Sequence, residues 1–147
     1  MKRGYYGIGM FEPKTIDNLG GLIRSAFCFK ANFVFTIGNR YHKEPTDTAD
    51  ATRHMPCFHY KDIQDFVEHL PKGVEVVGIE ITEKSKPLEK YTHTEKAVYI
   101  LGGEDRTLPA EVLDICTTIR SIDTRFCLNV ASCGTLVLYD RHLKSFK

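Results

Sequence analysis

Hydrophobic and polar residues form alternating blocks along this chain, and the blocks predict strands and helices in turn. Residues 5–11 and 32–38 are nearly continuous apolar runs, a pattern typical of strands buried on both faces of a parallel sheet. Between these runs, apolar residues recur at helical spacing from about residue 18 to residue 30, and Asp17 is the predicted N-cap. The three segments together predict a β-α-β unit.

The same alternation continues toward the C-terminus. The later predicted strands cover residues 58–60, 74–81, 97–101 and 117–122, and the later predicted helices cover residues 61–70, 109–116 and 128–144. This order favours an α/β fold with an open, mostly parallel sheet and helices on both faces. In such sheets, ligands bind beyond the carboxyl ends of the strands. The loops of interest are therefore residues 12–17, 80–90, 102–108 and 122–128.

Composition adds few constraints. A chain of 147 residues is expected to form one domain, residues 1–147, and its net charge of +1 gives no support by itself to a nucleic-acid partner. No apolar run is long enough to span a bilayer, the first residues make a poor secretory signal, and no membrane partner is expected. The five cysteines form no Cys-x-x-Cys pair, which favours a reducing cytoplasm.

Two glycines in the first predicted helix are the first unusual feature. Gly20 and Gly21 each cost about 1 kcal/mol relative to alanine in a helix, and they leave bare backbone beside Arg24. An arginine over such a surface, near a helix start, suits a phosphate or a ribose-phosphate. Close packing of another helix against the glycines, with Arg24 solvated, explains this feature equally well.

A second pair of glycines ends a buried strand. Gly102 and Gly103 are followed by Glu104, and glycines at this position allow a ligand to lie against the main chain. Taken alone, an ordinary tight turn is the simpler interpretation of this pair. The chain has neither a P-loop nor a Gly-x-Gly-x-x-Gly sequence, which disfavours ATP and NAD as ligands.

The start of the last helix is the third unusual feature. Residues 131–135 are small, which predicts close packing of the backbone, and Asn129 could hold an RNA or cofactor group at the helix start. His54, Cys57 and His59 have the spacing of metal ligands but lack a fourth partner, so we expect no metal site.

Together and in this order, the three stretches resemble the three motifs of the SpoU branch of the SPOUT methyltransferases. The resemblance covers nearly the whole chain. The first motif, Asn-x-Gly-x-x-x-Arg, is matched by Asn18, Gly20 and Arg24. The second is matched by Gly102, Glu104 and Leu108, with Thr107 in place of a glycine. The third is matched by Leu128, Asn129, Val130, Leu138 and Tyr139, with Cys127 and Ala131 in place of serines and Asp140 in place of glutamate.

The resemblance implies an enzyme that uses S-adenosylmethionine, without a metal, to methylate a ribose 2′-hydroxyl of RNA. The size is similar to that of the minimal members, notably the tRNA (cytidine/uridine-34) 2′-O-methyltransferases, so tRNA is the favoured substrate and rRNA the alternative. The family fold is an open α/β sheet whose C-terminal part is threaded into a deep trefoil knot. Its members work as homodimers with the catalytic pocket near the subunit interface.

The resemblance also assigns roles to residues. It places the cofactor against the main chain of three loops, which here carry Glu80, Ile81, Gly102, Gly103, Ser121, Ile122, Cys127 and Leu128. Arg24 would orient the hydroxyl and the adjacent phosphate and stabilise developing negative charge, since a guanidinium is a poor general base. Asn18 and Glu104 would position Arg24 and the RNA, and Asn129 would anchor the wall of the active site.

Two alternatives remain open at this point. One is a non-catalytic module on the same fold that binds S-adenosylmethionine or RNA, which the departures at Thr107 and Ala131 suggest. The other is an unrelated α/β nucleotide-binding or hydrolase domain.

Overall fold

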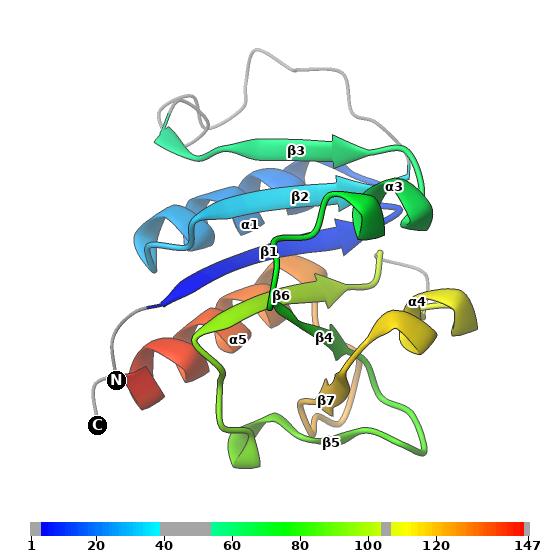
Figure 1. Cartoon of the computed structure of the whole chain (residues 1–147). Coiled ribbons are helices and arrows are strands. Elements are labelled where there is room, and N and C mark those ends of the chain that lie inside the picture. Colours follow the sequence, from blue (N-terminus) through cyan, green and yellow to red (C-terminus); the bar gives the residue numbers. More distant parts are fainter. Residues whose placement is uncertain (1–3, 39–53, 104–106, 146–147) are drawn as a thin grey trace.

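The computed structural model describes residues 4–38, 54–103 and 107–145. Within these residues, seven strands form one open sheet (Figure 1). The strands, in the order in which they lie across the sheet, are β3 (Cys57–Tyr60), β2 (Phe33–Ile37), β1 (Tyr5–Phe11), β6 (Lys96–Leu101), β4 (Glu75–Ile79), β7 (Thr118–Ser121) and β5 (Lys86–Pro87). Every neighbouring pair is parallel, which confirms the predicted α/β class.

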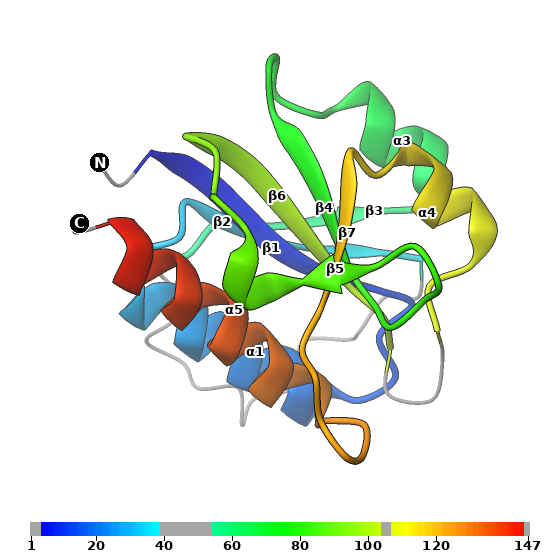
Figure 2. The same cartoon turned by 90° about the horizontal axis from the view of Figure 1, so that it is seen from below.

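Helices cover both faces of the sheet, as predicted. They are α1 (Ile16–Cys28), α3 (Ile63–Glu68), α4 (Ala110–Ile115) and α5 (Val130–Ser145), with a short 3-10 helix η1 (Leu88–Lys90). Helices α1 and α5 lie side by side on one face, and α3 and α4 lie on the other (Figure 2). None of the described helices is long and apolar enough to cross a membrane.

The central strands bury side chains on both faces, which explains their continuous apolar sequence. In β6, Tyr99 and Leu101 join the cluster beneath α1 and α5, whereas Val98 and Ile100 join the cluster beneath α3 and α4. Successive residues of a strand point to opposite faces, so a strand between two helical layers has no polar side.

Helices α1 and α5 run parallel and in register. A β-carbon added at Gly21 would lie 3.2 Å from Cβ of Ala131, and Oγ of Ser25 lies 2.6 Å from Oγ1 of Thr135. Each step advances four residues on both helices, so the contacts follow one face of each. In α5, a β-carbon at Gly134 would lie 2.4 Å from Cδ1 of Leu22. Close packing therefore accounts for Gly21, Ala131 and Gly134.

Two helix starts differ from the predicted ones. Thr15, not Asp17, is the N-cap of α1: its Oγ1 accepts a hydrogen bond from the Asn18 amide at 3.4 Å, so the helix begins at Ile16 and ends at Cys28. Threonine and aspartate are both good caps, and the strand-to-helix turn places the earlier one at the helix start. Helix α5 begins at Val130, later than predicted, because Asn129 Oδ1 accepts from the amides of Ala131 and Ser132 at 3.0 and 3.2 Å.

A buried polar network fastens the C-terminal half of α5 to the segment that leads into β6. Arg141 is 1% exposed and donates from Nη1 to the Thr94 carbonyl oxygen and the Tyr99 hydroxyl, both at 2.9 Å. Its Nη2 donates to the Glu95 carbonyl oxygen at 3.1 Å, and its guanidinium lies over the Tyr6 ring. One buried cation thus ties α5 to β1, to β6 and to the approach to β6.

His93 and Lys144 extend this network. The His93 ring lies between the Tyr99 hydroxyl, 2.6 Å from Nδ1, and Asp140, 2.7 Å from Nε2. Lys144 Nζ donates to Asp140 at 2.7 Å and to the Leu88 and Tyr91 carbonyl oxygens at 3.0 and 2.8 Å. Burial lowers the pKa of His93 to about 4, so its imidazole is neutral at neutral pH. These contacts define the α5 clamp: His93, Tyr99, Asp140, Arg141 and Lys144.

Candidate active site

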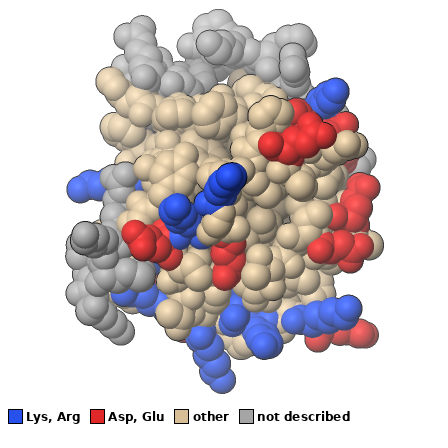
Figure 3. Space-filling view, viewed as in Figure 1, with Lys and Arg blue, Asp and Glu red and all other residues tan. Residues whose placement is uncertain are grey.

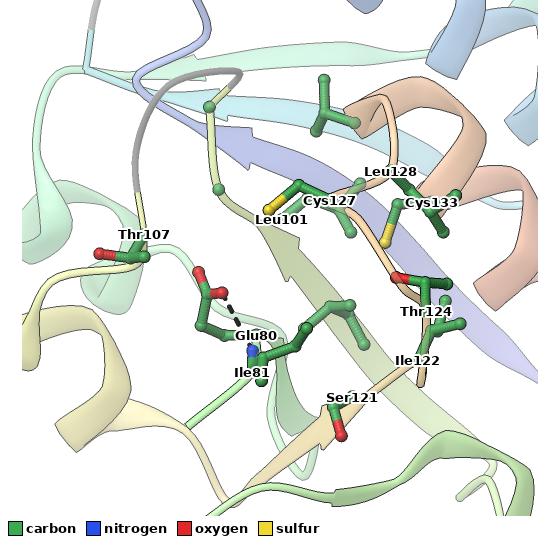
Figure 4. Close-up of a pocket in the computed structure, with 14 residues that line it drawn as sticks. Glu80, Ile81, Leu101, Thr107, Ser121, Ile122, Thr124, Cys127, Leu128 and Cys133 are labelled. Carbon is green, nitrogen blue, oxygen red and sulfur yellow. Dashed lines mark hydrogen bonds between the residues drawn. The ribbon is translucent and has the colours of Figure 1, made fainter. Parts of the chain in front are cut away.

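A cavity of about 330 Å³ opens at the carboxyl ends of β4, β6 and β7 (Figure 4). This is the edge at which open parallel sheets bind ligands, and the volume is in the range of small-molecule sites. Its lining includes all eight residues named above for the cofactor: Glu80, Ile81, Gly102, Gly103, Ser121, Ile122, Cys127 and Leu128. Their contact with a cofactor stays a prediction, but the structure brings them to one place.

Six further residues line the cavity that were not assigned to the cofactor from the sequence: Ile79, Leu101, Thr107, Thr124, Val130 and Cys133. All of them lie next to or within the strand ends, the loops and the helix start that form the site. Knowledge of the strand order would have found them, since β4, β6 and β7 are neighbours in the sheet but not in the sequence.

Glu80 holds two of the cavity loops together. Its Oε1 accepts from the Ile81 amide at 3.0 Å, and its Oε2 accepts from the Leu108 amide at 2.9 Å. Glu80 and Ile81 follow β4, whereas Leu108 follows β6, so one carboxylate joins the two loops. Figure 4 shows the first of these hydrogen bonds. This makes Glu80 a positioning residue as well as part of the wall.

The rest of the lining is apolar or carries hydroxyl and thiol groups. Cys127, Leu128 and Cys133 form one wall, opposite Glu80 and Thr107 (Figure 4). Burial, with a contribution from Glu80, raises the pKa of the Cys133 thiol to about 11, so this thiol stays protonated. The described residues that line the cavity include no lysine, arginine or histidine.

Gly103 marks a close approach of the chain to itself. A β-carbon there would lie 2.6 Å from the Glu12 carbonyl oxygen, at the end of β1. Only glycine fits this contact without a shift of the backbone. Gly103 therefore keeps the chain that leaves β6 close against the end of β1, while it also lines the cavity.

The first and third motifs meet at the N-termini of α1 and α5. Asn129 Nδ2 donates to Asn18 Oδ1 at 2.8 Å, although the two residues are 111 positions apart in the sequence. Because Asn129 Oδ1 also caps α5, its amide group is held at both ends. Val130, the next residue, lines the cavity, so this asparagine pair lies beside it.

Of the other two predicted catalytic residues, the structure describes only Arg24. Arg24 is exposed on α1 and does not line the cavity, and Glu104 lies outside the described residues. At the candidate zinc ligands, His59 Nδ1 lies 2.6 Å from Thr36 Oγ1, and the ring of His54 stacks on Phe27. In the part of the chain that the structure describes, no three His, Cys, Asp or Glu residues are placed to hold a metal.

Known proteins agree with this architecture. The family model of the SpoU rRNA methylases matches residues 7–139, nearly the whole chain. The chain belongs to the SpoU rRNA methylase family. A curated relative, the mouse tRNA (guanosine(18)-2′-O)-methyltransferase TARBP1, is 26% identical over an alignment of 132 residues that covers 84% of this chain. The chain spans only 8% of that protein's length.

Solved SpoU-family structures share the fold. One, from a study of 2′-OH methylation of C/U34 on tRNA, has a TM-score of 0.86 and 19% identity, and the match covers all of this chain and 94% of that one. The rRNA methyltransferase of Sinorhizobium meliloti, solved with S-adenosylmethionine bound, has a TM-score of 0.84 and 20% identity. The match covers 97% of this chain and 57% of that one. AviRb from Streptomyces viridochromogenes has a TM-score of 0.84 and 20% identity, and the match covers 97% of this chain and 60% of that one.

Proposed function

We propose that this protein is an S-adenosylmethionine-dependent RNA methyltransferase that modifies a ribose 2′-hydroxyl, with tRNA as the favoured substrate. The observation that carries the proposal is the cavity walled by main-chain loops after β4, β6 and β7, beside the Asn18–Asn129 contact, in a chain of the SpoU family. A position in the tRNA anticodon loop is the preferred target, and rRNA is the alternative substrate.

The chemistry of the lining fits this cofactor better than a nucleoside phosphate. A polyphosphate needs cationic side chains or a glycine-rich helix start, and the described lining provides no basic side chain. Apolar walls suit an adenine ring, and the hydroxyls of Thr107, Ser121 and Thr124 suit a ribose. S-adenosylmethionine, when bound, supplies a methyl group activated by the positive charge on its sulfur.

Arg24 is proposed to hold the RNA rather than to remove its proton. A guanidinium stays charged at neutral pH and offers a planar set of donors, so it suits a phosphate and a developing oxyanion. Asn129, held by Asn18 and by the start of α5, provides a fixed polar wall beside the cavity. Orientation of the hydroxyl and exclusion of water are then the main contributions of the protein.

A homodimer would bring Arg24 and a cavity together. In one chain Arg24 is exposed on α1 and is not part of the cavity wall. Nearby, Leu136, Tyr139 and Leu143 form an exposed apolar stripe on α5, and Phe27 is exposed on α1. We propose that this α1/α5 face contacts a second copy and that each Arg24 serves the cavity of that copy. Sedimentation at several protein concentrations tests the dimer, and a persistent monomer would contradict it.

Threading of the C-terminal helix through a knot is proposed on the same basis. Helix α5 is fastened between α1 and residues 88–95 by the α5 clamp, an arrangement that suits a helix passed through a loop of chain. A crystal structure with S-adenosylhomocysteine tests the threading and the cofactor site at once. An unthreaded helix or a product bound elsewhere would refute the corresponding proposal.

The decisive test of function is methyl transfer from labelled S-adenosylmethionine to separate tRNA and rRNA pools, followed by mapping of the ribose methyl group. We expect labelled tRNA. Arg24→Gln should reduce kcat/KM by about 100-fold or more, as loss of a transition-state donor does. Lys72→Gln, which removes the same charge from an exposed turn, should have no effect. Cofactor binding without transfer to any RNA would favour the non-catalytic module instead.

A further inference from the structure

Phe126 is the most exposed large hydrophobic side chain among the described residues, at 78% exposure. It lies in the loop between β7 and α5, which projects from the body of the molecule (Figure 2). An aromatic ring so placed contributes little to the core. Single exposed apolar side chains are common on protein surfaces and need no functional explanation by themselves. The position of this one is what makes it informative.

The loop that carries Phe126 borders the cavity. Thr124 Oγ1 donates to the Phe126 carbonyl oxygen at 2.7 Å, which fixes the turn. Thr124 and Cys127, on either side in sequence, both line the cavity. Adjacent Cα atoms are about 3.8 Å apart, so the phenyl group starts within one residue of the wall and extends from its rim.

Charge beside the ring suits a nucleic acid. Arg125 is exposed, and its guanidinium carbon lies 5.9 Å from the centre of the Phe126 ring. On the face seen in Figure 3, lysine and arginine gather mainly along the lower edge, acidic side chains are most frequent on the right-hand side, and groups of both signs lie near the centre, with no continuous patch of either sign. With a net charge of only +1, contacts to RNA must come from local groups such as this pair.

We propose that Phe126, supported by Arg125, is a stacking platform for a base of the RNA substrate, either the base of the methylated nucleotide or that of its neighbour. The inference rests on the proposed function. A ribose brought to the cavity must leave its base outside, and unpaired bases of RNA stack on aromatic side chains. A phenyl ring stacks on any base, so the platform would bind a single-stranded or looped segment with little sequence preference.

The chain contains no tryptophan, which provides a direct test. Phe126→Trp preserves stacking and introduces a single tryptophan, whose fluorescence can be excited selectively over that of the seven tyrosines. Titration with a short single-stranded oligoribonucleotide should quench this fluorescence, whereas an oligomer of the same length with abasic sugars should not. Phe58→Trp is the matched control, because Phe58 is 46% exposed on β3, outside the cavity wall, and should not respond. Quenching by S-adenosylhomocysteine alone would instead make Phe126 a cover for the cofactor and overturn the proposal.

Kinetics provide the second measurement. Phe126→Ala should raise the KM for RNA by about 10-fold or more, with kcat and S-adenosylmethionine affinity little changed. Phe126→Trp should have a KM for RNA close to that of the native protein. An unchanged KM for RNA would refute the stacking platform. Fluorescence of the Phe126→Trp variant that changes with protein concentration alone would indicate a dimer contact and would refute it as well. Base-dependent quenching without any methyl transfer would support base stacking on Phe126 and refute the proposed methyltransferase activity. Methyl transfer without quenching would support the activity and refute the stacking.

Discussion

Acid should destabilise the protein through His93 in the α5 clamp. His93 is 3% exposed, and burial lowers its pKa from 6.5 to about 4. The Asp140 carboxylate opposes this shift, whereas Arg141 and Lys144 add to it. In the unfolded chain the imidazole is solvated and titrates near 6.5. Stability is therefore full above pH 6.5 and falls as the pH drops toward 4, because only the unfolded chain gains the proton in that window.

The size of the effect follows from the two pKa values. Each pKa unit corresponds to about 1.4 kcal/mol, so a fall from 6.5 to about 4 removes about 3 kcal/mol from the free energy of unfolding. This is a large share of the roughly 5–15 kcal/mol that stabilises an ordinary domain. The protonated ring would also lose its role as acceptor toward the Tyr99 hydroxyl, 2.6 Å from Nδ1.

Denaturant unfolding between pH 7 and pH 4 measures this loss. His93→Gln removes the titrating group while keeping an amide that can donate to Asp140 and accept from Tyr99. We expect the native protein to lose about 3 kcal/mol more than this variant over the window. His69→Gln, at an imidazole with 60% side-chain exposure, is the control and should follow the native profile. Parallel profiles for the native protein and His93→Gln would refute the reasoning.

Three further predictions concern the cavity and its supports. Glu80→Gln replaces an oxygen that accepts a main-chain amide, so calorimetry should show S-adenosylmethionine bound about 10-fold more weakly, whereas Glu83→Gln on the same loop should bind normally. Gly134→Val should destabilise the fold by about 2 kcal/mol through overlap with Leu22, while exposed Ser132→Val should cost less than about 0.5 kcal/mol in denaturant unfolding. Asn18→Ala and Asn129→Ala should be coupled by about 0.5 kcal/mol or more in a double-mutant cycle of unfolding, and additive effects would contradict their contact.

The main elements could be predicted from the sequence because their patterns are local. Strands β1, β2, β4 and β6 are buried on both faces, and burial leaves a continuous apolar run. Strand β5 and helix η1 were missed. The two residues of β5 carry no pattern of their own and are strand only because they pair with β7. The choice of Thr15 over Asp17 as the cap of α1 likewise depends on the path of the chain after β1.

The candidate site divides in the same way. Its loops could be predicted, because parallel strands place their carboxyl ends at one edge of the sheet. The contacts that shape it could not. Asn129 meets Asn18 across 111 residues, and Glu80 bonds to the Leu108 amide across 28. Such contacts depend on which strands are neighbours, and no local pattern carries that information.

The structure also shows where the departures from the SpoU motifs lie. Ala131 lies at the α1–α5 contact, where the nearest atom to a β-carbon at Gly21 is its Cβ, so its lack of a hydroxyl suits close packing. Asp140, shorter than the glutamate of the motif, reaches both His93 and Lys144 at 2.7 Å in the α5 clamp. These two changes belong to the support of α5. Thr107 and Cys127, in contrast, line the cavity itself. We therefore expect a change in cofactor affinity or substrate to arise at these two positions. Thr107→Gly and Cys127→Ser, which restore the motif, should alter the affinity for S-adenosylmethionine or the choice of RNA, whereas Ala131→Ser should alter neither.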